Sequence, residues 1–212
     1  MRVKVIFAAA AVVVTTVLGG CAHSDQATPE PPKPAAENPA VKKPVQTPVS
    51  SPAETEALTG FSNRVNAYLD MHNRLERTLP NLSKETTPQA IDQHQRALAK
   101  LINAERQAAK RGDIFGPEAE KIFKSHLARI FGGPDGRQLK ASIMDENPVG
   151  AVKLTVNGRY PDEVPMSTVP PQVLAALPKL PEEIEYRFVG DHLILLDVHA
   201  HTIVDYIDNA LP

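Results

Sequence analysis

The chain has 212 residues, and 23 Lys and Arg against 25 Asp and Glu give a formal net charge of −2. This balance excludes the strongly basic surface typical of nucleic-acid-binding proteins, so we expect no nucleic-acid partner. A single cysteine excludes an intramolecular disulfide and any zinc site that needs several cysteines.

Residues 1–20 have the pattern of a lipoprotein signal peptide. A basic start precedes an uncharged apolar run from Val5 to Leu18, which is too short to cross a bilayer. The run ends in Leu-Gly-Gly-Cys, which looks like a lipobox with Cys21 as the acylated residue. We therefore predict a lipid-anchored protein of the cell envelope that faces the periplasm. Ala22 after the cysteine favours the outer membrane over the inner membrane.

Residues 21–53 are dominated by Pro, Ala, Lys, Glu, Thr and Ser, and they contain eight prolines. Few large apolar side chains are available for burial, so we expect a disordered, extended tether. One soluble domain is predicted to follow at 54–212, helical over 56–145 and mostly β over 150–212. This is an α+β fold, with a bundle of three to four helices packed against a small antiparallel β-meander.

Apolar residues at three- and four-residue spacing predict the helices. The first runs from Leu58 to Leu79 and is ended by Pro80. The second begins with the Thr-Pro pair at 87–88, buries Ile91 and is closed by Gly112. A third follows the Gly-Pro pair at 116–117 and extends to the Gly-Gly-Pro at 132–134, and a short fourth covers 137–144.

The second half of the domain favours strands. Alternation with β-branched residues predicts a strand at 152–156, followed by an Asn-Gly turn at 157–158. A short helix is expected at 170–177 before the prolines at 178 and 181. The meander is then predicted from strands at 184–189, 192–196 and 202–207, with a tight Gly-Asp turn between the first two.

Several motifs in this half occur in a fixed order, and together they carry a resemblance. They are Val-Asn-Gly-Arg-Tyr-Pro at 156–161, Thr-Val-Pro-Pro at 168–171, Leu-Pro-Lys-Leu-Pro at 177–181, Glu-Tyr-Arg-Phe-Val-Gly at 185–190 and Ile-Val-Asp-Tyr-Ile at 203–207. The block resembles a family of bacterial exported proteins that pair a helical region with this C-terminal segment. The resemblance implies a layout, and it transfers no activity and no catalytic residue.

Two groups of histidines are candidates for metal ligands. Asp197, His199 and His201 stand two residues apart, and imidazole and carboxylate groups suit Zn²⁺ or Cu²⁺. The favoured interpretation of this group is a solvated turn. His72, His94 and His126 lie on the apolar faces of three different predicted helices and could converge in the bundle, although packed, hydrogen-bonded histidines are the simpler expectation.

No catalytic motif stands out, since the chain has neither a Gly-x-Ser-x-Gly nor a His-Glu-x-x-His sequence. We therefore expect a non-catalytic envelope module that binds another protein, without a cofactor. A histidine-dependent metal-binding protein is the first alternative, and a small hydrolase with an unrecognised site is the second. The sequence carries no signal for an oligomeric state.

Overall fold

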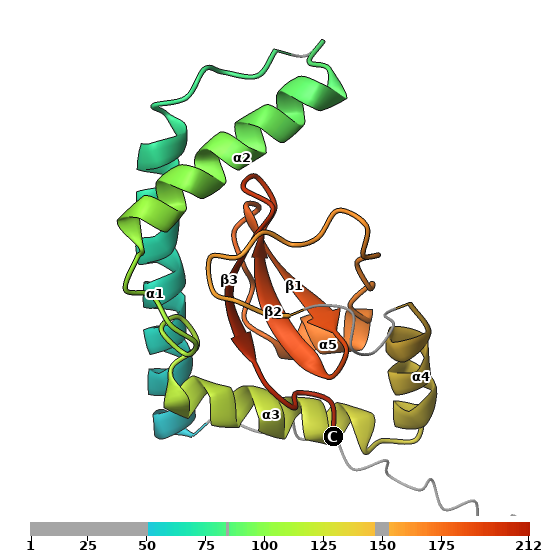
Figure 1. Ribbon diagram of the computed structural model, residues 1–212. Coiled ribbons are helices and arrows are strands. Elements are labelled where there is room, and N and C mark those ends of the chain that lie inside the picture. Colours follow the sequence, from blue (N-terminus) through green and yellow to red (C-terminus); the bar gives the residue numbers. More distant parts are fainter. Residues whose placement is uncertain (1–50, 84, 147–152) are drawn as a thin grey trace, which may run out of the picture. The chain divides into compact units, whose positions relative to one another are not determined.

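The computed structural model describes residues 51–83, 85–146 and 153–212, which form the predicted α+β fold (Figure 1). Five helices precede a three-stranded antiparallel sheet of order β1-β2-β3. The helices are α1 (Pro52–Glu76), α2 (Pro88–Glu105), α3 (Pro117–Phe131), α4 (Gly136–Glu146) and α5 (Pro171–Ala176). The strands are β1 (Ile184–Val189), β2 (His192–Asp197) and β3 (Thr202–Ile207).

The first helices begin where the sequence offers a cap. Ser51 and Thr87 accept hydrogen bonds from the main chain of the first turns of α1 and α2, and each is followed by proline at the first helical position. α3 follows Gly116, whose positive φ of 71° suits glycine, and carries acidic residues in its first turn. These local signals account for the starts of three helices without tertiary contacts.

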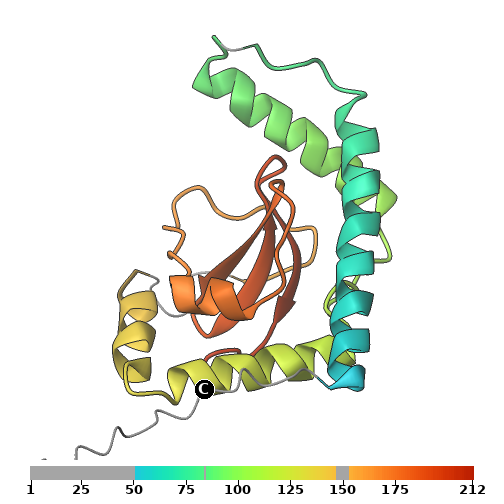
Figure 2. The same cartoon turned by 180° about the vertical axis from the view of Figure 1, so that it is seen from behind.

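The helices surround one face of the sheet. Figures 1 and 2 show α1 and α3 along two adjoining sides of the sheet, while α2 passes the end where the β2–β3 loop lies. Contact between α2 and this loop is direct, since the Gln95 side chain donates a hydrogen bond to the main-chain oxygen of Val198. The C-terminal end of α1, α2 and the β2–β3 loop therefore meet in one region.

An aromatic cluster forms the centre of the core between helices and sheet. The ring centroids of Phe61, Phe115 and Phe123 lie 5.1–5.4 Å apart, and Tyr186 of β1 lies 5.9 Å from Phe123. All of these side chains are buried. Each contributes about 1.5–3 kcal/mol through burial, so this cluster holds α1 and α3 against the sheet.

β2 is the central strand and is covered on both faces. Leu193 and Leu195 belong to the core beneath the helices, whereas Ile194 and Leu196 pack in a second cluster with Tyr160. This double burial explains why the strand is a continuous apolar run rather than an alternating one. β1 and β2 are joined by the predicted Gly-Asp turn, in which Gly190 has a positive φ of 58°.

Several sequence expectations were wrong. Residues 153–156 form no strand, and this part of the chain touches β3 through main-chain hydrogen bonds, including one from Asn157 to Ile203 and a single bridge between Arg159 and Thr202. The left-handed conformation of Asn157, with φ of 60°, turns the chain there before a ladder can extend.

The second error concerns α2, which ends at Glu105 and not at Gly112. The side chain of Asn157 accepts from the Arg106 guanidinium and donates to the Arg106 main-chain oxygen, and turns follow. Tertiary hydrogen bonds thus replace the last two helical turns that periodicity favoured. Ile91 was expected to point inward, but its side chain is 40% exposed.

The signal peptide at 1–20, Cys21 and nearly all of the predicted tether lie outside the described residues. α1 extends from Pro52 to Glu76, whereas the sequence placed this helix at Leu58–Leu79, the domain boundary at 54 and Pro52 in the tether. Within the described part of the chain, none of the helices combines the length and the apolar character that crossing a membrane requires.

Candidate functional site

A buried carboxylate at the end of β2 is the base of the candidate site. Asp197 is fully buried, and its Oδ2 accepts a hydrogen bond from the Tyr68 hydroxyl at 2.7 Å and lies 2.6 Å from His72 Nδ1. Its Oδ1 accepts from the main-chain N–H of Ala200 at 2.8 Å. Burial, followed by the charge of Asp197, raises the pKa of Tyr68 well above its usual value, so the hydroxyl remains a donor.

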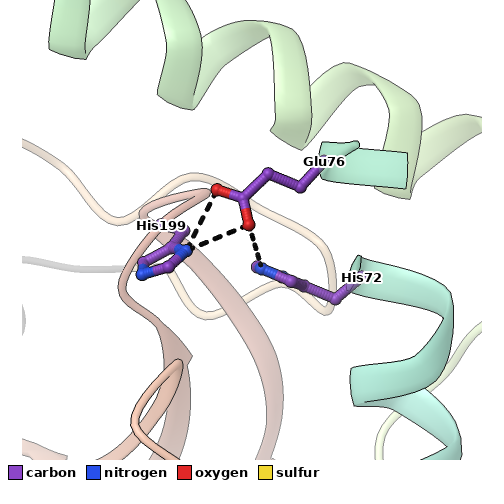
Figure 3. Close-up of side chains that lie close together, drawn as sticks. All are labelled: His72, Glu76 and His199. Carbon is purple, nitrogen blue, oxygen red and sulfur yellow. Dashed lines mark hydrogen bonds and ion pairs between the residues drawn. The ribbon is translucent and has the colours of Figure 1, made fainter. Parts of the chain in front are cut away.

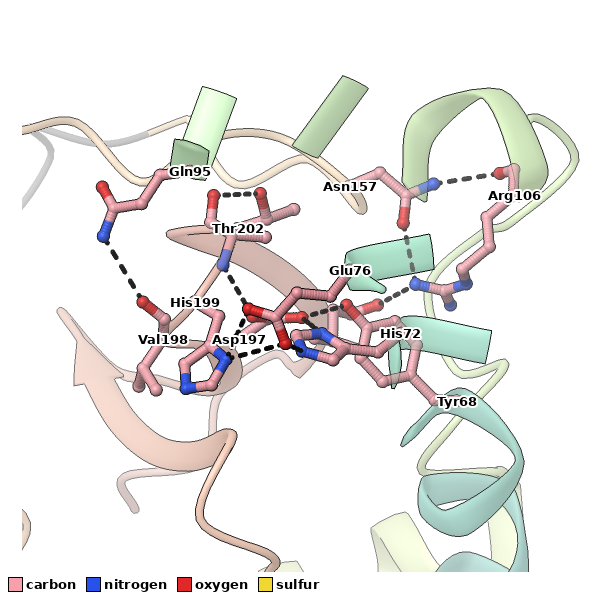
Figure 4. A network of polar contacts seen from close by, with 12 residues as sticks. Tyr68, His72, Glu76, Gln95, Arg106, Asn157, Asp197, Val198, His199 and Thr202 are labelled. Carbon is pink, nitrogen blue, oxygen red and sulfur yellow. Dashed lines mark hydrogen bonds and ion pairs between the residues drawn. The ribbon is translucent and has the colours of Figure 1, made fainter. Parts of the chain in front are cut away.

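Helical spacing brings the other groups to this carboxylate. Tyr68, His72 and Glu76 are successive i, i+4 neighbours on the inner face of α1, so their side chains form one row along the helix. Tyr68 and His72 reach Asp197, and Glu76 lies one turn further toward the β2–β3 loop. Figure 4 shows this row meeting the loop at its end.

The contact with Asp197 determines which nitrogen of His72 is available. An ionised carboxylate only accepts hydrogen bonds, so Nδ1 of His72 must carry the hydrogen in that contact. Among the described residues, no group makes a hydrogen bond of normal geometry to His72 Nε2, although the histidine is fully buried. This nitrogen lies 3.3 Å from Glu76 Oε2 and is directed into the cluster (Figure 3).

His199 completes a group of three. It projects from the β2–β3 loop with 45% of its side chain exposed, and its Nδ1 lies 3.0 Å and 3.3 Å from the two carboxylate oxygens of Glu76. One ligand atom from each of His72, Glu76 and His199 lies within 4.8 Å of the others (Figure 3). We call these three residues the His-Glu-His cluster.

The charges in the cluster favour a cation. Burial by itself would lower the pKa of His72, but its hydrogen bond to Asp197 and the charges of Asp197 and Glu76 raise it overall. Burial would likewise raise the pKa of Glu76, but His199, His94 and His72 together lower it. Two carboxylates therefore flank the His72 ring, an environment that stabilises positive charge, whether a proton or a metal ion supplies it.

Two of the three separations between ligand atoms of the cluster match a tetrahedral metal site. Zinc binds His nitrogen and carboxylate oxygen at about 2.0–2.1 Å, so two ligand atoms of a regular tetrahedron lie about 3.3 Å apart. Oε2 of Glu76 lies 3.3 Å from His72 Nε2 and 3.3 Å from His199 Nδ1, and both separations agree with this value. In addition, the contact between Asp197 and His72 has the form of the carboxylate–histidine pairs that orient metal ligands.

The structure divides the two histidine groups identified in the sequence and recombines them. From the helical group, His72 joins the cluster, and His94 lies beside it with Nε2 3.3 Å from Glu76 Oε1. His126 lies elsewhere, with its two ring nitrogens near the Ala176 main-chain oxygen and the Glu54 carboxylate.

From the strand-end group, His199 joins the cluster and Asp197 supports it. His201 turns away, with its ring against Tyr160 and Nε2 3.6 Å from Asp162. Burial and, next, the charge of Arg159 lower the pKa of His201. Arg159 itself is held by ion pairs to Asp92 and Asp162.

Glu76 is the residue that sequence analysis missed. The signal was present, because His72 and Glu76 have the i, i+4 spacing that places two ligands on one helical face. Asp205, four residues after His201, is not one of the clustered ligands. Its carboxylate accepts from the main-chain N–H groups of Gly112, Ile114 and Phe115.

Comparisons of this chain with protein-family models, with curated proteins and with solved structures each found no match. A function for the domain must therefore be supported by its own side chains.

Proposed function

We propose that the domain binds one divalent transition-metal ion, with Zn²⁺ as the first choice, through His72, Glu76 and His199. The observation that carries the proposal is the fully buried His72 ring. Its Nδ1 is held by Asp197, and the contact of its Nε2 with Glu76 is a 3.3 Å ion pair that lacks hydrogen-bond geometry. A buried polar atom is costly unless it is well paired, and a metal ion held by both groups would give Nε2 a better partner than this contact.

The donor set favours zinc over calcium or magnesium. Two imidazole nitrogens and one carboxylate are ligands of borderline softness, whereas Ca²⁺ and Mg²⁺ require mainly oxygen ligands. Copper binds similar sites more tightly in vitro, so selectivity would also depend on metal supply. A closed structural zinc site has four protein ligands. The proposed site has three, which leaves a fourth position for water or another molecule.

The experiment is a metal titration of the full-length protein, purified without a histidine tag and stripped with a chelator. Isothermal titration calorimetry with Zn²⁺ should give one site per chain. His199→Asn and Glu76→Gln should each weaken Zn²⁺ binding at least about 100-fold. Removal of a residue that only hydrogen-bonds to a metal ligand typically weakens metal affinity about 10- to 100-fold, and loss of a ligand itself should exceed this. His192→Asn is the matched control, because His192 pairs with Asp191 and Asp208 outside the cluster.

Two results would contradict the metal site. One is the absence of stoichiometric Zn²⁺ binding, and the other is equal affinity in the wild type, His199→Asn and Glu76→Gln. Both cluster variants change at least partly exposed side chains, since His199 is 45% and Glu76 is 27% exposed. Circular dichroism of each variant would check that the fold is retained.

We also propose that the protein works at the envelope, held by a lipid on Cys21. This location is supported by the sequence of residues 1–21 and predicts a mature N-terminus at an acylated cysteine. Mass spectrometry of the protein from membranes of an expressing bacterium would test it. The binding of an envelope protein partner and the second alternative, a small hydrolase, stay predictions.

A further inference from the structure

A small cavity opens beside the His-Glu-His cluster at the C-terminal end of α1. It measures about 210 Å³ and is lined by Asn73, Glu76, Arg77, Asn81, Leu82 and His94. Glu76 is shared with the proposed metal site, and His94 Nε2 contacts the same carboxylate. The cavity therefore borders the proposed metal site at the Glu76 carboxylate.

Arg77 is the cationic group of this cavity. Its main-chain N–H closes the end of α1, but the described residues offer no hydrogen bond or ion pair to its exposed guanidinium. Arg74, three residues earlier, is by contrast paired with Glu105 at 2.8 Å. An unpaired guanidinium presents a fork of donors that matches the oxygens of a carboxylate or a phosphate.

The rest of the lining suits the same kind of ligand. Asn73 and Asn81 bring side-chain amides that can donate to oxygen, and Leu82 supplies an apolar edge. A volume of 210 Å³ is about seven times the share of one water molecule in liquid water, and it is smaller than typical drug-binding cavities. The cavity thus has room for a small anion but not for a large cofactor.

We infer that the metal ion, if bound as proposed above, takes a small oxyanion as its fourth ligand, and that Arg77 binds the other oxygens of this anion. The inference rests on the proposed function, since the open coordination position belongs to the His-Glu-His cluster. Its new content is the chemical class of the ligand, a small carboxylate or a phosphate, and the role of Arg77 in binding it.

Cobalt substitution tests the ligand and the metal separately. The full-length protein, stripped and loaded with Co²⁺, should show the visible absorption of a bound cobalt ion. Titration with acetate or with inorganic phosphate should then shift this absorption in a saturable way, because the anion replaces water on the metal. A response to acetate alone assigns the site to carboxylates, and a response to phosphate alone assigns it to phosphates.

Arg77→Gln should raise the anion concentration at half-saturation about tenfold, because a charge-assisted hydrogen bond to the anion is lost. The Co²⁺ affinity should be unchanged. Arg74→Gln, on the same helix but paired outside the cavity, should match the wild type.

Cobalt binding without any spectral response to either anion would overturn the inference and leave the metal site intact. Equal anion affinity in Arg77→Gln and the wild type would also overturn it, and absence of bound cobalt would overturn the metal site and the inference together.

Discussion

Two aspartates of the sheet, Asp197 and Asp205, are both fully buried, yet their surroundings differ. Asp205 on β3 is surrounded by main-chain donors, since it accepts from the N–H groups of Gly112, Ile114 and Phe115. Asp197 on β2 is held mainly by side chains, those of Tyr68 and His72. The first carboxylate fixes the course of a loop, and the second fixes the orientation of an imidazole.

This difference shows what a buried carboxylate can be used for. A main-chain N–H is a permanent donor, so Asp205 can only stabilise the turns at 112–115. An imidazole has two nitrogens, and a contact at one determines the state of the other. Through its contact with Nδ1, Asp197 therefore determines the state of the other ring nitrogen, His72 Nε2. The substitutions below separate this role from that of Asp205.

The largest effect on stability is expected for Asp205→Asn. An asparagine turns one acceptor oxygen into an NH₂ donor that faces main-chain N–H groups, so at least one buried donor loses its partner. Removal of one side of a buried charged contact costs about 3–5 kcal/mol. Urea denaturation of the metal-free protein would measure this loss in the free energy of unfolding. Zinc affinity of the folded variant should equal that of the wild type, and a weakened affinity would contradict the separation of roles.

Zinc itself should stabilise the domain by the next largest amount. A ligand that binds the native state raises the free energy of unfolding by about 2.7 kcal/mol when its free concentration is 100 times the dissociation constant. Thermal denaturation with and without Zn²⁺ should show this rise for the wild type and for Asp205→Asn. The same free Zn²⁺ concentration should stabilise His199→Asn much less, and an equal gain in that variant would place the ion elsewhere.

Asp197→Asn should cost about 2 kcal/mol in the free energy of unfolding, less than the change at Asp205. The reason is that His72 can adapt by accepting the new amide N–H at Nδ1. That tautomer puts a hydrogen on Nε2, the nitrogen proposed to bind metal, so zinc affinity should fall about 10- to 100-fold. Calorimetry would measure the affinity, and unchanged zinc binding would show that Asp197 does not position His72.

Tyr68→Phe should have the smallest effect, about 1 kcal/mol in stability, because it removes one hydrogen bond from Asp197 and retains the buried ring. Asp197 keeps its contact with His72, so zinc affinity should change less than in Asp197→Asn. Paired denaturation and calorimetry would test both expectations. A zinc defect as large as that of Asp197→Asn would mean that the hydroxyl takes part in the site directly.

Local sequence signals predicted most of the fold. The Thr-Pro pair at 87–88, the Gly-Pro before α3 and the Gly-Asp turn at 190–191 act within a few residues, and the structure confirms the elements that they start or join. The end of α2 and the strand expected at 152–156 were wrong because Asn157 acts across the fold on Arg106 and Ile203. Contacts of this kind carry no local signature.

The candidate site was predictable only in parts. His72, His94 and His199 were all identified as candidates, but in separate groups, because His72 and Asp197 are 125 residues apart in the chain. Their meeting depends on how α1 packs against the end of β2. Periodicity places His72 and Glu76 on one face of a helix, but it does not say which strand end that face will meet.

The most direct test of the metal site is anomalous X-ray diffraction from crystals of the full-length protein grown with Zn²⁺. Data collected on both sides of the zinc absorption edge should show one strong anomalous peak, about 2.0–2.1 Å from His72 Nε2, His199 Nδ1 and a carboxylate oxygen of Glu76. A zinc peak found only at other histidines, such as His126 or His192, or no peak at all, would contradict the account.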